Sequence, residues 1–75
     1  MSKKADIVEA QGEIIREDGN GYFRVQLKEP EGHECLCRAS GRLITRKIQL
    51  LVGDTVTVEL SPYDLGRGRI TMRNK

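Results

Sequence analysis

The sequence has few of the residues that usually provide catalytic or metal chemistry. Its 75 residues include two cysteines, one histidine and three aromatic side chains, and no tryptophan. A structural zinc site needs four ligands, commonly in paired Cys-x2-Cys knuckles, so His33, Cys35 and Cys37 fall one ligand short. A disulfide between residues two positions apart on a strand would be strained. We therefore interpret both cysteines as reduced thiols packed in a core, and we expect no metal and no cofactor.

Signals for an enzyme and for a membrane protein are also missing. No apolar run approaches the ~20 residues that span a bilayer. Residues 1–6 contain lysines without a following apolar stretch, which argues against a secretory signal and favours a cytoplasmic protein. The segment Gly66-Arg67-Gly68 lacks the Lys-Ser/Thr of a phosphate-binding loop. Because His33 also lacks a nucleophile and an orienting acid at a recognisable spacing, we predict that the protein is not an enzyme.

Charge is distributed unevenly along the chain. Residues 1–34 carry eight acids and five bases, a net charge of −3, whereas residues 35–75 carry eight bases and three acids, a net charge of +5. The eight bases of the second part fall in two runs, at residues 38–47 and 67–75. Segregated positive charge indicates a polyanionic partner, although a solvated basic face without a partner is the alternative.

Turn residues divide the chain into short segments with the period-two alternation of half-buried strands. The expected strands cover residues 7–16, 22–28, 34–39 and 55–60, and the alternation resumes after a loop at 63–68. The turn signal at 17–21 predicts a hairpin. We expect Thr57, Arg69, Thr71 and Arg73 on the outer face. The side chains expected to face the core are Val8, Ala10, Ile14, Phe23, Val25, Leu27, Cys35, Cys37, Ala39, Val56, Val58, Leu60, Ile70 and Met72.

Residues 40–54 are too many for a turn and too apolar for a free loop. We predict a short helix or 3-10 turn with Ser40 as its N-cap, then an apolar plug; the apolar residues of this connector are Leu43, Ile44, Ile48, Leu50, Leu51 and Val52. Gly12, on the inner side of a long first strand, predicts a bend or a close backbone approach. This order of elements predicts an all-β, five-stranded OB barrel: one domain over 1–75, with flexible ends at 1–6 and 74–75.

The basic residues are the best functional candidates. Arginine grips phosphates bidentately and stacks on bases, so a surface formed by the two basic runs would attract RNA. The only aromatic residues are Tyr22, Phe23 and Tyr63, and Phe23 is expected in the core. A platform for free single strands usually interleaves several aromatics with basic residues. The sequence therefore favours a folded RNA as the partner.

Five motifs, in order and over nearly the whole chain, resemble those of bacterial translation initiation factor 1. They are Gln11-Gly12, Phe23-Arg24-Val25-x-Leu27, Ser40-Gly41-Arg42, Gly53-Asp54-x-Val56-x-Val58-Glu59 and Ser61-Pro62-Tyr63-Asp64-Leu65-x-Arg67-Gly68-Arg69-Ile70. The block from Gly53 to Ile70 is the most specific. The resemblance implies an OB-fold, in agreement with the order of strands reached from alternation alone.

The resemblance also implies a non-enzymatic, monomeric factor that binds the small ribosomal subunit at the aminoacyl decoding site during initiation. There it would contact ribosomal RNA and a neighbouring ribosomal protein, occlude elongator tRNA, and select initiator tRNA with initiation factors 2 and 3. The motif positions associated with RNA contact are Ser40, Gly41, Arg42, Arg67, Arg69 and Arg73, while Tyr63 would support its loop or stack. The basic runs add Arg38, Arg46 and Lys47 to these RNA-binding candidates.

The resemblance is weakest in the connector. After Ser-Gly-Lys/Arg the family usually has Met or Ile, then bases and an aromatic, whereas here the pair Arg46-Lys47 is displaced by two residues and Gln49 replaces a usual arginine. Two other hypotheses remain. A cold-shock-like RNA chaperone or general single-stranded RNA-binding OB protein would share the fold, but its aromatic motifs are absent. A protein interaction module would instead use the basic face to meet an acidic partner.

Overall fold

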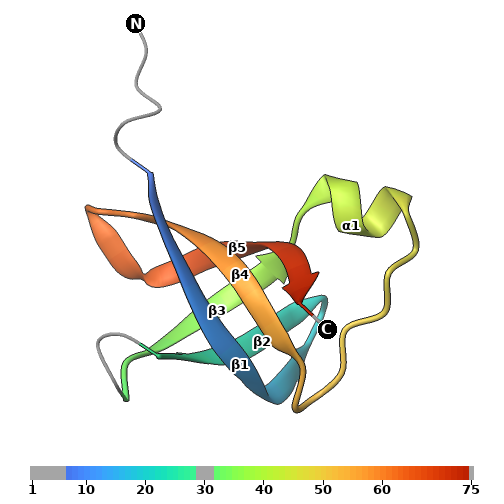
Figure 1. Cartoon of the computed structure of the whole chain (residues 1–75), viewed down its shortest axis with the longest axis horizontal. Coiled ribbons are helices and arrows are strands. Elements are labelled where there is room, and N and C mark those ends of the chain that lie inside the picture. Colours follow the sequence, from blue (N-terminus) through green and yellow to red (C-terminus); the bar gives the residue numbers. More distant parts are fainter. Residues whose placement is uncertain (1–6, 29–31, 75) are drawn as a thin grey trace, which may run out of the picture.

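The computed structural model is a closed five-stranded barrel with a short helix at one end (Figure 1). It describes residues 7–28 and 32–74. The elements are, in order, β1 (Val8–Gly19), β2 (Tyr22–Leu27), β3 (Glu34–Ala39), α1 (Gly41–Thr45), β4 (Thr55–Ser61) and β5 (Asp64–Asn74). The prediction of three strands, a helical connector and two strands is confirmed, and with it the OB-type barrel.

The strands follow the order β1-β2-β3-β5-β4 around the barrel, and β4 closes it by pairing with β1. All neighbouring pairs are antiparallel except β3 and β5, which are parallel. The long β1 serves two partners, β2 through residues 12–19 and β4 through residues 8–13. Asn20 and Gly21 connect β1 to β2 with φ of 56° and 80°, as a two-residue type I′ turn requires. The predicted hairpin is therefore confirmed.

Two glycines allow strands to approach closely. A Cβ atom on Gly12 would lie 2.6 Å from the carbonyl oxygen of Gln26 and 2.8 Å from Cγ1 of Val25. A Cβ atom on Gly68 would lie 2.8 Å from the carbonyl oxygen of Glu59 and would strike the side chain of Leu60. The close approach predicted at Gly12 is confirmed, and Gly68 performs the same role between β5 and β4.

The core fills the barrel with aliphatic side chains and the two cysteines, which are free thiols as predicted. The Sγ atoms of Cys35 and Cys37 lie 3.4 Å apart, and the Cys35 thiol donates to the carbonyl oxygen of Val25 at 3.7 Å. The hydrogen bond with Cys35 and burial raise the pKa of the Cys37 thiol above its ordinary value. Cys37 therefore stays protonated at neutral pH and acts as a small packing residue.

A bulge at Thr71 changes the predicted faces of β5. Ile70 pairs with Val58 and Met72 with Thr57, so Thr71 has no partner of its own on β4. The prediction that Met72 packs in the core is wrong, because beyond the bulge its side chain is 55% exposed. The same step places Arg73 opposite the buried Val56, so the prediction that Arg73 faces outward is also wrong.

Thr57 lies on the outer face as predicted, yet it is buried. It has Gln11 of β1 on one side and Met72 of β5 on the other. The side-chain amide of Asn74 donates a hydrogen bond of 2.9 Å to the Thr57 hydroxyl. Neighbouring side chains therefore cover Thr57 on the outside of the barrel.

The connector between β3 and β4 packs only a few of its apolar side chains against the barrel. Its apolar anchors are Leu43 and Leu50, which are buried, and Ile48, which is partly buried. The prediction of an apolar plug is wrong for Ile44, Leu51 and Val52, which are more than half exposed. The connector arches away from the barrel after α1, so that only part of its apolar surface can turn inward (Figure 1).

Both ends of the described chain lie at the rim of the barrel. Val8, the first residue of β1, is 40% exposed, so its predicted place in the core is wrong. Asn74 is the last residue of β5. The flexible ends expected at 1–6 and at Lys75 lie outside the described residues. Within residues 7–28 and 32–74, no helix has the length and hydropathy needed to cross a membrane.

Candidate nucleic-acid interface

The strand register brings the two basic runs together on the outside of β2, β3 and β5. Tyr22 pairs with Arg38, and Arg38 pairs with Arg69. In the next row, Leu36 pairs with Arg67. Paired residues of neighbouring strands project from the same side of a sheet, so all five share one surface. We call this surface, formed by Tyr22, Leu36, Arg38, Arg67 and Arg69, the arginine face.

Arg38 is held against an aromatic ring. Its guanidinium carbon lies 5.4 Å from the centroid of the Tyr22 ring, within the range of a cation–π contact. Tyr22 is partly buried, whereas Arg38 is exposed. The contact therefore fixes a flat cationic group at the surface instead of leaving a flexible side chain in solvent.

Helix α1 places a further arginine beside this surface. Ser40 caps the helix, since its hydroxyl accepts a hydrogen bond of 3.5 Å from the backbone N–H of Leu43, as predicted. A hollow of about 270 Å³ between α1 and the strands is lined by Ser40, Gly41, Arg42, Glu59, Arg69 and Thr71. Arg42 and Arg69 thus share one hollow, although they lie far apart in the sequence. Ser40 itself is buried and acts by setting the start of the helix.

The end of α1 forms a Schellman motif with lysine in the left-handed position. The N–H of Lys47 donates to the carbonyl of Ile44, and the N–H of Ile48 donates to the carbonyl of Leu43, both at 3.0 Å. Lys47 has φ of 58°, a conformation in which glycine is usual and a Cβ atom is strained. Arg46 and Lys47 are both exposed there, so the strained backbone of Lys47 coincides with one RNA-binding candidate and adjoins another.

The arginines differ in whether they already form an ion pair with a carboxylate. Arg69 donates to Glu59 at 3.0 Å. Arg73 donates to the carbonyl of Gln49 at 2.9 Å and lies 3.9 Å from Asp54, so it holds the connector to β5. Among the described residues, five of the seven basic candidates form no ion pair, and these are Arg38, Arg42, Arg46, Lys47 and Arg67.

Tyr63 lies in the turn between β4 and β5. Its side chain is 86% exposed, so the ring projects into solvent and does not support the turn. A hydrogen bond from the Tyr63 N–H to the Ser61 hydroxyl, Oγ, at 3.1 Å holds the turn instead. His33 Nε2 lies 2.9 Å from the carbonyl oxygen of Leu65, which ties the start of β3 to this turn.

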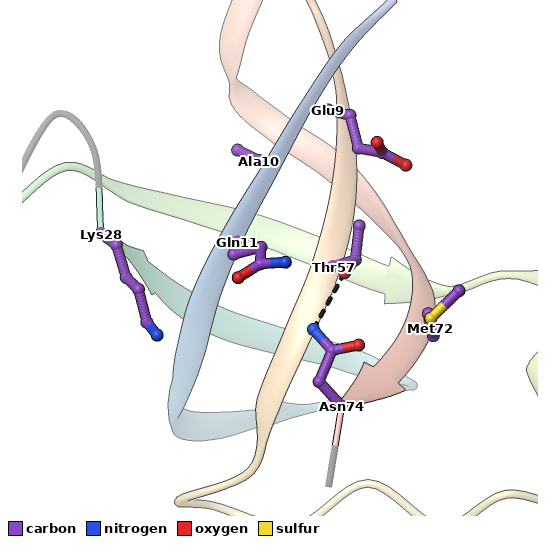
Figure 2. Close-up of a pocket in the computed structure, with 7 residues that line it drawn as sticks. All are labelled: Glu9, Ala10, Gln11, Lys28, Thr57, Met72 and Asn74. Atoms are coloured by element: carbon purple, nitrogen blue, oxygen red, sulfur yellow. Dashed lines mark hydrogen bonds between the residues drawn. The ribbon is translucent and has the colours of Figure 1, made fainter.

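A wider hollow of about 640 Å³ lies over β1, β4 and the end of β5, and Figure 2 shows its lining. Its charged residues are Glu9 and Lys28, which appear on opposite sides of the hollow in that view. Asn74 and Thr57, which both line it, are joined by the hydrogen bond drawn as a dashed line in Figure 2. With a single base and a single acid, this hollow lacks the concentration of positive charge that marks the arginine face.

The structure brings Arg38, Arg42, Arg67 and Arg69 together, and it places Arg46 and Lys47 after α1. Tyr63 and Arg73 lie outside this group. Sequence reasoning missed the contribution of Tyr22 and Leu36. Their outward positions followed from alternation, but their place beside Arg38 and Arg67 follows from a strand register that alternation does not supply.

Comparisons with known proteins agree with the fold and with the sequence motifs. A family model described as translation initiation factor 1A / IF-1 matches residues 2–75. The solution structure of translation initiation factor IF-1 from the Wolbachia endosymbiont of Brugia malayi is 35% identical, with a TM-score of 0.76, over 97% of this chain and 84% of that one. These matches confirm the resemblance seen in the sequence, and with it a non-enzymatic translation factor.

Two further structures share the barrel alone. YjeQ from Thermotoga maritima is 24% identical with a TM-score of 0.74, over 91% of this chain and 23% of that chain. YloQ, described as a circularly permuted GTPase, is 22% identical with a TM-score of 0.76, over 100% of this chain and 25% of that chain. This chain therefore corresponds to about a quarter of each of those proteins, and at these identities the likeness concerns the fold only.

Proposed function

We propose a ribosomal role for this chain, which belongs to the translation initiation factor 1A / IF-1 family. In this proposal it works in the cytoplasm and binds the small ribosomal subunit at the aminoacyl decoding site. It occludes elongator tRNA there, contacts ribosomal RNA and a neighbouring ribosomal protein, and supports selection of initiator tRNA with initiation factors 2 and 3. The supporting observation is the arginine face, where Arg38 and Arg67 have no carboxylate partner among the described residues.

The proposed mechanism is electrostatic docking followed by steric exclusion. Positive charge without a carboxylate partner can neutralise phosphates directly, because no existing ion pair has to be broken first. We assign direct phosphate contacts to the five basic candidates that form no ion pair with the described residues, namely Arg38, Arg42, Arg46, Lys47 and Arg67. Arg69 would join them by exchanging Glu59 for a phosphate.

The remaining candidates would act in other ways. Ser40 and Gly41 would present the first turn of α1, since Ser40 is buried and Gly41 carries no side chain. Tyr63 would stack through its exposed ring. Arg73 would act indirectly by holding the connector, because its guanidinium already binds the carbonyl of Gln49.

Cosedimentation with small ribosomal subunits over a range of salt concentrations tests the proposal. If about four to six phosphates are neutralised, log affinity should fall with log salt at a slope of roughly −3 to −4. A tRNA bound at the aminoacyl site should compete with the protein. Binding that does not respond to salt would contradict the electrostatic docking, and binding alongside that tRNA would contradict the exclusion.

Two further assays separate the two other hypotheses. An RNA chaperone should bind unstructured oligonucleotides about as tightly as it binds subunits. A protein interaction module should retain its partner from extract that has been treated with nuclease. The proposed function predicts neither result.

A further inference from the structure

We infer that Asn20 is a site of spontaneous deamidation, at which the backbone nitrogen of Gly21 displaces the side-chain amide and the chain comes to carry isoaspartate. The reaction needs only water, so the inference goes beyond the proposed function. Its effect on RNA affinity alone rests on that function.

The turn at the end of the β1–β2 hairpin exposes the attacking nitrogen. Of the two asparagines in the chain, only Asn20 is followed by glycine. The Gly21 N–H donates to no backbone carbonyl in the described part of the chain, as expected of a central residue in a two-residue turn. Apart from its two neighbours, no heavy atom lies within 4 Å of the position that a Cβ atom would take on Gly21. The nitrogen is therefore accessible.

The side chain that it attacks is also unrestrained. Asn20 forms no side-chain hydrogen bond with the described residues. Every residue from 16 to 21 is exposed, and the pairing of β1 with β2 is irregular between Glu17 and Gly19. Such a segment opens locally at low cost. When the turn opens, rotation about the Cα–C bond of Asn20 brings the Gly21 nitrogen to face Cγ.

The reaction balances with water as its only co-reactant. The Gly21 nitrogen loses its proton and forms a bond to Cγ of Asn20, and the bond from Cγ to Nδ2 breaks. Nδ2 leaves as ammonia and carries the proton that the Gly21 nitrogen lost, so that a succinimide ring remains. Water then opens the ring at either carbonyl. Opening at Cγ gives aspartate, and opening at the main-chain carbonyl gives isoaspartate, whose main chain runs through Cγ.

Two similar side chains are protected from the same reaction. Asp18 also precedes a glycine, but Arg16 and Arg24 bind its carboxylate at 2.6 and 3.3 Å. The hydrogen bond from Arg16, with the attraction of both arginines, lowers the pKa of Asp18, so the group stays ionised and is a poor electrophile. Asn74 precedes lysine, and its amide donates to the Thr57 hydroxyl at 2.9 Å. Reactivity is therefore confined to the turn.

Isoaspartate would change both the turn and the surface beside it. Its extra main-chain carbon lengthens a connection of two residues, directly after which Tyr22 pairs with Gly19. The Tyr22 ring holds the guanidinium of Arg38, 5.4 Å from its centroid. A displaced Tyr22 releases Arg38, and the new carboxylate adds negative charge two residues from that ring. Deamidation should therefore weaken the arginine face as the protein ages.

Incubation of the wild-type full chain in neutral buffer tests the site. The readout is peptide mapping with fragmentation that separates aspartate from isoaspartate. Asn20 should lose its amide about tenfold faster than Asn74, because the end of the hairpin opens locally whereas Asn74 is held by Thr57. Isoaspartate should be the larger product. Equal rates at the two asparagines would overturn the inference, and so would aspartate without isoaspartate, since direct hydrolysis passes through no ring.

A matched pair of variants tests the nucleophile. Gly21→Ala should slow the loss of the amide several-fold, because the methyl group shields the attacking nitrogen. Gly19→Ala is the control, since it strains the same turn, with φ of 85° against 80°, but leaves Gly21 in place. It should not slow the reaction. Equal slowing in both variants would mean that the shape of the turn sets the rate, and would overturn the role given to the Gly21 nitrogen.

The isoaspartate form, separated by ion exchange, tests the consequence. It should unfold at a temperature lower by about 5 °C and bind small subunits several-fold more weakly than fresh protein. Asn20→Asp carries the charge without the extra carbon, so it should keep the unfolding temperature of the wild type. An unchanged unfolding temperature and affinity for the isoaspartate form would overturn the effect on the arginine face. If fresh wild type fails to bind subunits, the proposed function fails, and the peptide map still decides the site.

Discussion

The hairpin of β1 and β2 and the arginine face both expose arginines, but in different electrostatic settings. At the hairpin, Arg16 and Arg24 both bind Asp18, at 2.6 and 3.3 Å, and Arg24 also lies 3.9 Å from Glu34. On the arginine face, Arg38 and Arg67 have no ion pair within the described residues. Unneutralised charge, more than the number of arginines, therefore distinguishes a candidate RNA surface from a structural one.

Arg69 is intermediate between the two settings. It lies on the arginine face yet donates to Glu59. An exposed ion pair contributes only about 0–1 kcal/mol to stability, so exchanging Glu59 for a phosphate costs little. Changes in both regions test this distinction.

Gly68→Ala should have the largest effect, a loss of stability, because it disrupts the close approach of β5 and β4 that supports the arginine face. The added Cβ atom would meet the carbonyl oxygen of Glu59 at 2.8 Å and the Leu60 side chain. Overpacking of this kind costs about 1–3 kcal/mol, and we expect a loss near the upper end, measured by denaturant unfolding. The control is Gly66→Ala, where the nearest atom is 3.6 Å away and the change should be within ~0.5 kcal/mol. Equal stability of the two variants would mean that the close approach of β5 and β4 at Gly68 does not exclude a side chain.

Arg67→Gln should weaken binding to small subunits about five- to tenfold at low salt and make the salt slope less steep by about 1. Its stability should change by less than ~0.5 kcal/mol, since the side chain is exposed and makes no ion pair with the described residues. Arg16→Gln is the matched control from the hairpin, where the arginine is already bound to Asp18. If both variants lost affinity equally, the distinction between the two regions would fail.

Lys47→Gly should raise the free energy of unfolding by about 1 kcal/mol, because glycine removes the strain of a left-handed backbone. Its affinity for subunits should fall a few-fold through loss of the charge. Lys47→Ala separates these effects, since it loses the same charge but keeps the strain. A gain in stability for the alanine variant as large as that for glycine would show that φ of 58° is not the cause.

Glu59→Gln should increase affinity for subunits about two- to threefold by releasing Arg69, at a cost in stability below ~1 kcal/mol. The corresponding change at the hairpin, Asp18→Asn, releases Arg16, whereas Arg24, which pairs with Leu36 of the arginine face, still has Glu34 at 3.9 Å. It should therefore raise affinity less than Glu59→Gln does. Cosedimentation at one low salt concentration measures both. A loss of affinity in Glu59→Gln would mean that Glu59 positions Arg69 for binding.

The smallest effect concerns acid stability of the hairpin. The hydrogen bond from Arg16, with further attraction from Arg16 and Arg24, lowers the pKa of Asp18 in the folded protein. Its contribution to stability is therefore present above the ordinary pKa of about 3.9 and is lost as the pH falls through the lowered native value. The wild type should unfold at a slightly higher temperature than Asp18→Asn at pH 7, and this difference should shrink below pH ~3.9. A difference independent of pH would exclude the carboxylate as its source.

Local patterns were sufficient for most of the fold. Alternation gave β3 as it is observed, the Asn20-Gly21 turn gave the hairpin, and Ser40 gave the start of α1. Gly12 was correctly expected to allow a close approach. These features depend on neighbours in the sequence or on a single backbone requirement, which a sequence displays directly.

What the sequence did not display depends on pairing between distant segments. The bulge at Thr71 arises from how β5 pairs with β4, and it moved Met72 outward and Arg73 inward. Exposure of Ile44 and Leu51 follows from the path of the connector. In the candidate site, basic residues could be named from the sequence, but Tyr22 beside Arg38 and Glu59 beside Arg69 required the register.

The pairing of β5 with β3 also determines the order in which parts of the barrel can form. β5 fills the place between β3 and β4, so both strands keep an unpaired edge until it arrives. It is the last described strand to be synthesised, and it brings Arg67 and Arg69 with it. A growing chain can therefore assemble the hairpin early, but it acquires the arginine face only when nearly all of the described chain has left the ribosome. Refolding should likewise be limited by joining segments far apart in the sequence, the slow step of β proteins with non-local contacts.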